Sequence, residues 1–540
     1  MKRTCTVLLG GLAAATILAA PTLADEMTPG LTRLATVPVG AEITGMYITE
    51  NGDLFYNAQH PADSNPAPNN LATIGVLTGV DFNALPASVP GLKLPETDAE
   101  KQGFMSSLGA YQAIAREGDF DKDIPGGLGA IMAADGSKIK QSNDPDFNAY
   151  VPVSRDGNTG YLFANWEDRP GGMSRMRVTK DASGAWSIAD NDVSMLDFSS
   201  VHGTWVNCFG SLSPWSTPLT SEELYFDDTA DWNNADYKYH KDQVALEKHL
   251  GRYPNPYDYG YIVEISDPTG QALPVKHFTM GRYSHENTVV MPDMRTAYLT
   301  DDGTDVVFYK FVADRAGNLG SGTLYAAKVT QDEGSDPATT GFNIEWIELG
   351  HGDNGAIHRW IREYDGITTA DYTAGGNNYI SDDDVAAWAA GNAADDRVAF
   401  LESRKAAKAL GATAEFRKME GIMINQAGAA DGSVPYVYMA MSEIGKGMAD
   451  DEGDVRLDAN TCGVVYQLKL DRDYDVARME PAVAGFGYNK DAANNQCNVG
   501  GVSNPDNIMV LKDGRVLIGE DTGNHENNML WVWDPAASAS

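Results

Sequence analysis

One short segment of the chain combines the residue types that bind two kinds of metal ion. It runs from Asn207 to Glu223, with Cys208 near its start, a Pro-Trp turn in its middle and the adjacent acids Glu222 and Glu223 at its end. Thiolates bind transition metals well, and carboxylates bind hard cations such as calcium. The segment therefore suggests a mixed metal site. The alternative, which the spacing alone favours, is a buried free thiol beside a solvated acidic pair.

Further acids lie at or beside the ends of predicted strands. Carboxylates that separate strands bring to one place repel one another, and bound cations relieve that repulsion. The candidate groups are Asn165-Trp166-Glu167, His285-Glu286 with Asp301-Asp302, Arg417-Lys418-Met419-Glu420, and Asp506-Asn507 with Glu520-Asp521. Taken singly, each acid is expected to cap a turn or face solvent, and His285 is expected to be a structural, hydrogen-bonded histidine. Convergence of several groups is what a metal site requires.

The elements that would position these residues are short strands. Runs typical of β-strands recur after residue 160, and Asp-Gly and Asn-Gly turns separate many of them, as at 155–158 and 512–514. Recurrent short strands without a linker predict an all-β fold, a β-propeller, in one domain over residues 25–540. Two stretches differ from this pattern. Residues 382–410, which follow Ser381, predict a helical insertion, and a short helix is expected around 242–250.

The first 24 residues have the features of an export signal. Lys2 and Arg3 supply a positive start, residues 7–20 form an apolar run, and Thr22-Leu23-Ala24 is a small-residue cleavage site. The apolar run is too short for a membrane anchor. We therefore expect cleavage near Ala24 and a periplasmic or secreted protein.

Charge restricts the partners. The chain carries 40 Lys and Arg against 76 Asp and Glu, for a formal net charge of −36, and loss of Lys2 and Arg3 with the signal would make it −38. Such a field repels nucleic acid and anionic lipid, so we expect neither nucleic acid nor a membrane as a partner. A small phosphate ester would need bound cations to overcome the repulsion. We expect a monomer.

Three cysteines remain after cleavage of the signal. Cys462 and Cys497 lie near the C-terminus and could pair, which would leave Cys208 as the free thiol.

Taken in order, the clusters resemble the PhoX-type alkaline phosphatases, exported metallophosphatases built on a six-bladed β-propeller. The resemblance runs from about Tyr161 to Trp533. It is carried by Asn165-x-Glu167, the ungapped segment from Asn207 to Glu223, Tyr259-Gly-Tyr-Ile-Val-Glu264, Gly281-Arg-x-x-His-Glu286, Tyr298-Leu-Thr-Asp-Asp302, Glu420-Gly421 and Pro505-Asp-Asn507. With these elements in order, a metal site is favoured over a passive thiol.

The resemblance implies a cluster of ferric iron and calcium ions that binds the phosphoryl group. Cys208 would ligate iron, and Glu286 and Glu420 would be bridging or iron-side carboxylates. Asn165 would donate a hydrogen bond to a phosphate oxygen, with Glu167 beside it. The remaining implied ligands, for calcium or in support of other ligands, are Glu222, Glu223, Asp302 and Asp506.

Two departures from the family pattern concern the substrate. Arg-Pro-Glu is usual in the family where this chain has Lys418-Met419-Glu420, so either Lys418 or Arg417 would hold the phosphate. A lysine is a point charge, whereas an arginine offers a two-pronged fork. The second departure is Trp166, which stands where the family has histidine.

The function that these residues predict is hydrolysis of phosphomonoesters by a metal-dependent alkaline phosphatase. Clustered cations neutralise phosphate charge and lower the pKa of bound water. A calcium-dependent propeller hydrolase of phosphodiesters, phosphotriesters or lactones is one alternative. A non-catalytic propeller that metals only stabilise is another.

Overall fold

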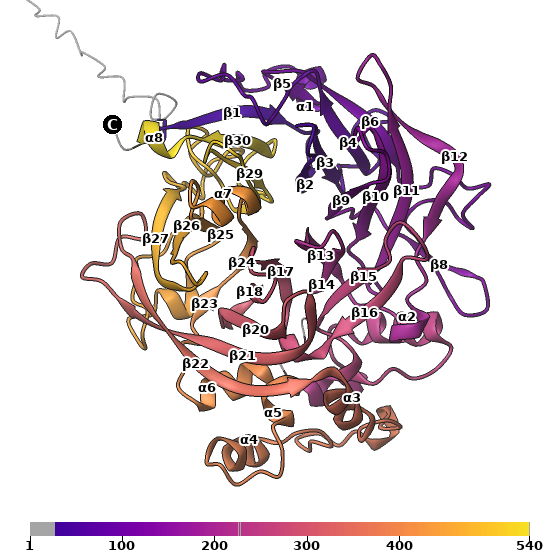
Figure 1. Cartoon of the computed structure of the whole chain (residues 1–540), viewed down its shortest axis with the longest axis vertical. Helices are drawn as coiled ribbons and strands as arrows, with labels where there is room; N and C mark the ends of the chain where they lie inside the picture. The colour runs from indigo at the N-terminus through magenta and orange to yellow at the C-terminus, as the bar shows by residue number, and fades with distance from the viewer. Residues whose placement is uncertain (1–26, 225, 227, 539–540) are drawn as a thin grey trace, which may run out of the picture.

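The structure is a computed structural model that describes residues 27–538 apart from 225 and 227. The predicted export signal, residues 1–24, lies outside the described residues. Antiparallel sheets stand around a central axis, so the predicted β-propeller is confirmed (Figure 1). Their strands form six blades, and blades four and five are joined in one nine-stranded sheet. Among the described residues, no helix combines the length and the apolar character needed to cross a membrane.

Each blade begins with an innermost strand and continues outward through antiparallel neighbours. Blades one to three are β2 (Glu42–Ile48), β3 (Leu54–Gln59), β4 (Thr73–Thr78) and β6 (Ala110–Arg116); β9 (Asn148–Pro152), β10 (Thr159–Trp166), β11 (Gly172–Lys180) and β12 (Trp186–Met195); and β13 (Asn207–Leu212), β14 (Pro218–Glu222), β15 (Ile262–Ser266) and β16 (Leu273–His277). Blade four holds β17 (His285–Val290), β18 (Thr296–Asp301), β20 (Tyr309–Arg315), β21 (Asn318–Gln331) and β22 (Phe342–Asp353).

Blade five holds β24 (Met419–Met423), β25 (Tyr436–Met441), β26 (Val464–Leu470) and β27 (Val476–Ala484), and β27 also pairs with β22 of blade four. Blade six holds β28 (Pro505–Val510), β29 (Val516–Glu520), β30 (Met529–Trp533), β1 (Leu31–Thr36) and β5 (Met105–Ser106). Because β1 pairs with β30, the start of the described chain completes the last blade and closes the ring. The two-stranded sheets are β7 (Ala130–Met132) with β8 (Lys138–Gln141) and β19 (Thr304–Val306) with β23 (Phe416–Arg417).

The innermost strands contact one another in sequence around the axis: β2, β9, β13, β17, β24, β28 and back to β2. Their first residues meet at one end of the axis, as the grouping of Cys208, Glu286, Glu420 and Asp506 shows, and later residues of five of them line one cavity at the other end. Strands β17 and β28 are buried along their whole length, whereas β2, β9 and β13 end in half-buried or exposed residues.

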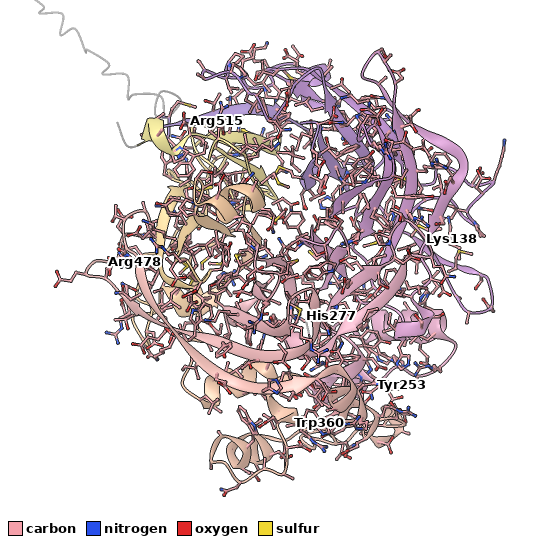
Figure 2. The ribbon with its side chains drawn as sticks, in the orientation of Figure 1. Lys138, Tyr253, His277, Trp360, Arg478 and Arg515 are labelled. Atoms are coloured by element: carbon pink, nitrogen blue, oxygen red, sulfur yellow. A yellow bond between two sulfur atoms is a disulfide. The ribbon has the colours of Figure 1, made fainter. Side chains whose placement is uncertain are left out.

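Helices lie mostly outside the blades. The predicted insertion at 382–410 contains α4 (Asp382–Ala389), α5 (Arg397–Leu401) and α6 (Ser403–Ala409), and Ser381 caps α4 through a reciprocal bond with Asp384. Together with α3 (Asn354–Arg362) they pack against blade four, and Figure 2 shows Trp360 in this helical layer. The helix expected around 242–250 is α2 (His240–Leu250). The short helices are α1 (Asp98–Lys101), α7 (Gln426–Asp431) and α8 (Pro535–Ser538).

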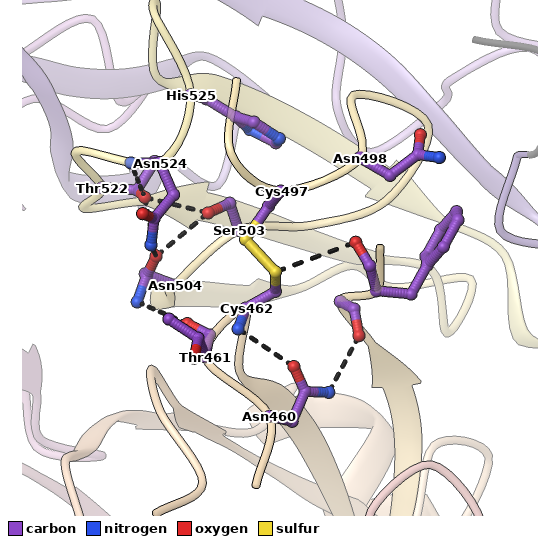
Figure 3. Close-up of a disulfide and its surroundings, with 12 residues drawn as sticks. Asn460, Thr461, Cys462, Cys497, Asn498, Ser503, Asn504, Thr522, Asn524 and His525 are labelled. Atoms are coloured by element: carbon purple, nitrogen blue, oxygen red, sulfur yellow. Dashed lines mark hydrogen bonds between the residues drawn. A yellow bond between two sulfur atoms is a disulfide. The ribbon is translucent and has the colours of Figure 1, made fainter. Parts of the chain in front are cut away.

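A disulfide ties blade five to blade six. Cys462 precedes β26 and Cys497 precedes β28, and the two are bonded, which confirms the predicted pairing (Figure 3). Polar side chains surround the bond, and the side chain of Asn460 accepts a hydrogen bond from the backbone of Cys462 at 2.9 Å. Cys208 is a free and buried thiol.

Candidate metal centre

The innermost strands carry an acid or a thiol at or just before their first residues. Because the strands start at the same end of the axis, these side chains converge there. They are Glu42 on β2, Asp146 before β9, Cys208 on β13, Glu286 on β17, Glu420 on β24 and Asp506 on β28.

A β-bulge accompanies this position in four blades. The pairing register shifts between Asn207 and Gly210 on β13, and the same three-residue step recurs at the start of β17, β24 and β28. A bulge bends the strand and re-aims one side chain. In each of the four blades, the candidate ligand lies inside the shifted step, so the bulge turns it toward the axis.

The thiol of Cys208 lies between strands of neighbouring blades and contacts acids from two of them. Its sulfur lies 3.1 Å from Asp146 Oδ2 and 3.1 Å from Glu286 Oε2. All three side chains are buried. Sulfur and carboxylate oxygens from three blades therefore share one small volume.

Three groups of side chains bring their ligand atoms within 4.8 Å of one another. Cys208 belongs to two of these groups, and the third contains only carboxylates. The groups are Asp146, Cys208 and Glu286; Glu167, Cys208 and Glu223; and Glu286, Glu420 and Asp506. The first two combine sulfur with oxygen, which suits a transition metal, and the third suits a hard cation.

Burial and mutual repulsion shift the acids toward their neutral forms. Burial, followed by repulsion from Glu420 and Asp506, raises the pKa of Glu286 well above its ordinary value. Burial also raises the pKa values of Glu167 and Glu420 to about 7, with Asp144 and Asp302 respectively as the largest like charges. The pKa of the Cys208 thiol rises for the same reasons. At neutral pH the centre must hold protons or bind cations.

Unpaired acceptor atoms favour cations. Three buried oxygens, Asp146 Oδ1, Asn165 Oδ1 and Glu223 Oε1, receive no hydrogen bond from the described residues. Buried oxygens are almost always paired, and an oxygen that lacks a donor is a natural ligand for a metal ion. The donor set therefore fits metal ions of both kinds.

The comparisons with known proteins point the same way. A family model, alkaline phosphatase PhoX, matches residues 163–534. The chain belongs to the alkaline phosphatase PhoX family. It is thus a member of a family of phosphoric monoester hydrolases, as the sequence motifs predicted.

One solved structure supports the fold. The PhoX of Pseudomonas fluorescens, solved in complex with vanadate, a transition state analogue, is 18% identical with a TM-score of 0.52 and aligns over 94% of this chain and 88% of its own. A Trichoderma reesei protein of carbohydrate-active family AA12 is 10% identical over 96% and 99% of the two chains, but its TM-score of 0.37 is too low to carry an argument. No curated protein matches the sequence.

Glu222 and Glu223 lie on opposite sides of their strand end. Both are buried, so the alternative of a solvated acidic pair is wrong. Glu222 is held inside the blade by Lys276 Nζ at 2.9 Å and by three backbone N–H groups at 3.1 Å. Glu223 faces the centre. The geometry therefore supports Glu223 as a ligand and places Glu222 in the blade, outside the three groups.

The next blade repeats this arrangement. Asp301 is buried and bonded to the guanidinium of Arg404, whereas Asp302 faces the centre and lies 3.4 Å from Lys418 Nζ. Lys418 Nζ also lies 3.0 Å from Glu420 Oε1. The ammonium of Lys418 is therefore part of the centre. Its backbone φ is 48°, an unusual value for a residue with a side chain, and such strain concentrates at functional sites.

Arg417, the other candidate for phosphate binding, points elsewhere. Its guanidinium donates to Thr304 Oγ1 at 2.6 Å and to Glu443 Oε2 at 2.6 Å. Of the two cations, Lys418 alone contacts the acids of the centre.

Asn165 and Glu167 are both beside Cys208. The amide nitrogen of Asn165 donates to the backbone oxygen of Cys208 and so supports the strand that carries the thiol. Glu167 Oε2 accepts a hydrogen bond from Gln59 Nε2 at 2.9 Å. His285 is buried and neutral, because burial lowers its pKa to about 3, and its Nε2 lies 2.9 Å from the backbone oxygen of Gly281. It is the structural histidine that was expected.

The sequence prediction missed Asp146, which belongs to the first ligand group. It also missed Glu42, which lies at the same end of the axis but belongs to none of the three groups and pairs with His60 Nε2 at 2.5 Å. Both precede residue 161, where the family resemblance begins. The available signal for Asp146 was an Asp-Pro-Asp run just ahead of a buried strand, the same position that the other candidate ligands occupy.

Proposed function

We propose that this chain is an exported phosphomonoesterase whose centre holds iron on the Cys208 thiolate and calcium on the neighbouring carboxylates. It would act as a monomer on small organic phosphate esters. The observation that carries the proposal is the position of the Cys208 sulfur, 3.1 Å from carboxylates of two other blades. A calcium-only centre gives no reason for a thiol at this point.

Two of the ligand groups contain the Cys208 sulfur and one contains only carboxylates, which supports two kinds of ion. Asp146, Cys208 and Glu286 would hold the iron, and Glu286 would also face the oxygen-only group. Glu420 and Asp506 complete that group and would hold calcium. Glu167 and Glu223, with Asp302 nearby, would bind a further cation. Bound cations would neutralise the phosphate and lower the pKa of a water molecule.

The chain's own residues would orient the ester. Lys418 Nζ, held by Glu420 and Asp302, lies where it can donate to a phosphoryl oxygen, and a donor fixed in place favours the charge that grows in the transition state. The side-chain amide nitrogen of Asn165 donates to the backbone oxygen of Cys208, and its Oδ1 is buried without a hydrogen-bond donor among the described residues. Removal of water by the buried walls would strengthen these interactions.

Export accounts for the disulfide. A disulfide between Cys462 and Cys497 is typical of an oxidising compartment, and the predicted signal over residues 1–24 would deliver the chain there. N-terminal sequencing of protein from the periplasm or medium should begin at Asp25. A mature chain that keeps Lys2 and Arg3 would contradict export by cleavage.

Metal analysis together with activity tests the proposal. Protein purified from its export route should contain both iron and calcium, and should hydrolyse p-nitrophenyl phosphate faster than bis(p-nitrophenyl) phosphate. Cys208→Ser should lose iron and activity but keep its circular dichroism spectrum. The double variant Cys462→Ser/Cys497→Ser, which removes two cysteines away from the centre, should keep its iron. Full activity with calcium and no transition metal would overturn the iron assignment.

A further inference from the structure

The far end of the propeller axis holds a cavity that the metal centre does not use. Its volume is about 610 Å³, within the range of about 300 to 1,000 Å³ usual for small-molecule sites. All six innermost strands contribute to its wall. One residue from each strand is Met46, Asn148, Gly210, Val289, Met423 and Met509.

The same strands therefore carry two opposite chemistries. Their first residues supply the acids and the thiol, whereas on five of the six strands later residues, such as Met46, Val289 and Met423, line the cavity. On β9 the lining residue is Asn148, the first residue of the strand. Gly210 lies two residues beyond Cys208, and Val289 lies three beyond Glu286. At about 3.3 Å per strand residue, Gly210 and Val289 lie roughly 7 to 10 Å along their strands from the candidate ligands Cys208 and Glu286.

Apolar side chains form most of the wall, polar side chains such as Thr49 and Ser213 form part of it, and the two charged residues lie at the mouth. Met46, Phe147 and Val289 are buried in it. Of the residues that line the cavity, two are charged, Glu50 and Lys512, and both are exposed. Because both are exposed, no described residue places a buried charge inside the cavity to pair with a charged ligand. Such a ligand would lose its hydration without compensation.

Two polar atoms in the wall lack partners among the described residues. Asn148 Oδ1 and Ser211 Oγ are buried and unbonded, although the amide nitrogen of Asn148 donates to the backbone oxygen of Gly45 and to Asn57 Oδ1. Asn148 is fully buried, and Ser211 is 2% exposed. Asn148 Oδ1 can only accept a hydrogen bond, and Ser211 Oγ can donate or accept. An apolar wall with a few convergent polar groups is the usual form of a small-molecule site.

We propose that this cavity binds an uncharged, apolar molecule that carries one hydrogen-bond donor, such as a phenol or an aromatic alcohol. The ring system would contact the methionine and valine side chains, and its hydroxyl would donate to Asn148 Oδ1. The site is separate from the metal centre, and it does not depend on the proposed phosphatase function.

The test uses 2-naphthol as the probe and the full, metal-loaded protein. Fluorescence titration should show saturable binding of one probe per chain. Because it has no donor, 2-methoxynaphthalene should bind several-fold more weakly. Saturating inorganic phosphate should leave the affinity for 2-naphthol unchanged, since phosphate would bind at the opposite end of the axis.

Two substitutions by tryptophan on one helix test whether the probe binds in this cavity. Ala427 is exposed and lines the mouth of the cavity, whereas Ala430 is exposed on the same helix, α7, and does not line it. Ala427→Trp should fill the mouth and raise the Kd at least about tenfold, equivalent to about 1.4 kcal/mol, and Ala430→Trp should leave it unchanged. Equal binding by both variants, displacement by phosphate, or no saturable binding would each overturn the proposal.

Discussion

The sulfur of Cys208 lies 3.1 Å from Asp146 Oδ2, although 62 residues separate the two in the chain. They stand on adjacent blades, and both are buried where the innermost strands begin. A buried carboxylate next to a buried thiol, with a second carboxylate, Glu286, also 3.1 Å from the sulfur, is unfavourable unless protons or cations compensate. This contact assigns to Asp146 a role that the family motifs did not indicate.

The variant Asp146→Asn tests whether Asp146 is a metal ligand or an acid with a structural role. We expect kcat/KM for p-nitrophenyl phosphate to fall by roughly 100-fold or more and the bound iron to decrease, because one ligand oxygen is lost. In chelated protein the same change should raise the Tm, since it removes one of several repelling acids. Asp121→Asn, an exposed turn residue, is the control and should alter neither quantity. A lower Tm for chelated Asp146→Asn would indicate a structural acid.

The neighbours Glu222 and Glu223 should respond in opposite ways. Glu222→Gln leaves the buried Lys276 without its charged partner, and breaking a buried ion pair costs roughly 3 to 5 kcal/mol, so the Tm should fall while folded protein keeps its metal. Glu223→Gln should lose metal and activity with little change in the Tm. Thermal unfolding and metal analysis of both variants check this. Loss of metal in Glu222→Gln with an unchanged Tm would reverse the assignment.

The pair also shows how far the sequence predicts the site. Adjacent residues on a strand face opposite sides, so one acid of each pair could be expected to face the centre. Which of the two does so depends on the bulges and on the partners inside the blade, such as Lys276, and neither is visible in a motif.

The fold was predicted in part for a similar reason. Strands from residue 160 onward match the predicted runs, but blade one was not anticipated, and the number of blades came from resemblance alone. Ring closure by β1 against β30 joins the two ends of the described chain, and no local periodicity encodes such a pairing. Asp146 was missed because its contact with Cys208 exists only once the blades are arranged around the axis.

Substitutions of Lys418 and Arg417 test which of the two side chains binds the phosphate. Lys418→Met should lower kcat/KM by roughly 100-fold, because a fixed donor to the transferring group is typically worth that much, and should weaken inhibition by vanadate. Arg417→Met should change both values only a few-fold, since Arg417 contacts Thr304 and Glu443. Lys418→Arg keeps the charge and should retain most activity. A larger effect at Arg417 than at Lys418 would place the phosphate on the other side of the strand.

The disulfide should stabilise the chain without affecting the centre. It spans 35 residues, for which chain entropy predicts a contribution on the order of 3 to 4 kcal/mol. Cys462→Ser/Cys497→Ser should therefore lower the Tm and keep kcat for p-nitrophenyl phosphate. Loss of activity at a temperature where the double variant is fully folded would show that the link between blades five and six positions Asp506.

Removal of metal should make stability fall as pH rises. In the chelated protein the folded state raises the pKa values of Glu167 and Glu420 to about 7, and those of Glu286 and Asp506 well above their ordinary values. Between the ordinary carboxyl pKa, about 4.3, and these raised values, the folded state holds more protons than the unfolded state, so its free energy of unfolding decreases with pH.

The measurement is Tm against pH from 5 to 9, with and without chelator. Chelated protein should lose Tm steadily up to at least about pH 7, whereas protein with its metals should stay nearly level, because cations replace the protons. Glu286→Gln should flatten the curve of the chelated protein, since it removes a group whose ionisation is costly. A Tm that rises with pH in the chelated wild type would mean that the acids are already compensated by the chain itself, and the case for a metal cluster on the axis would fail.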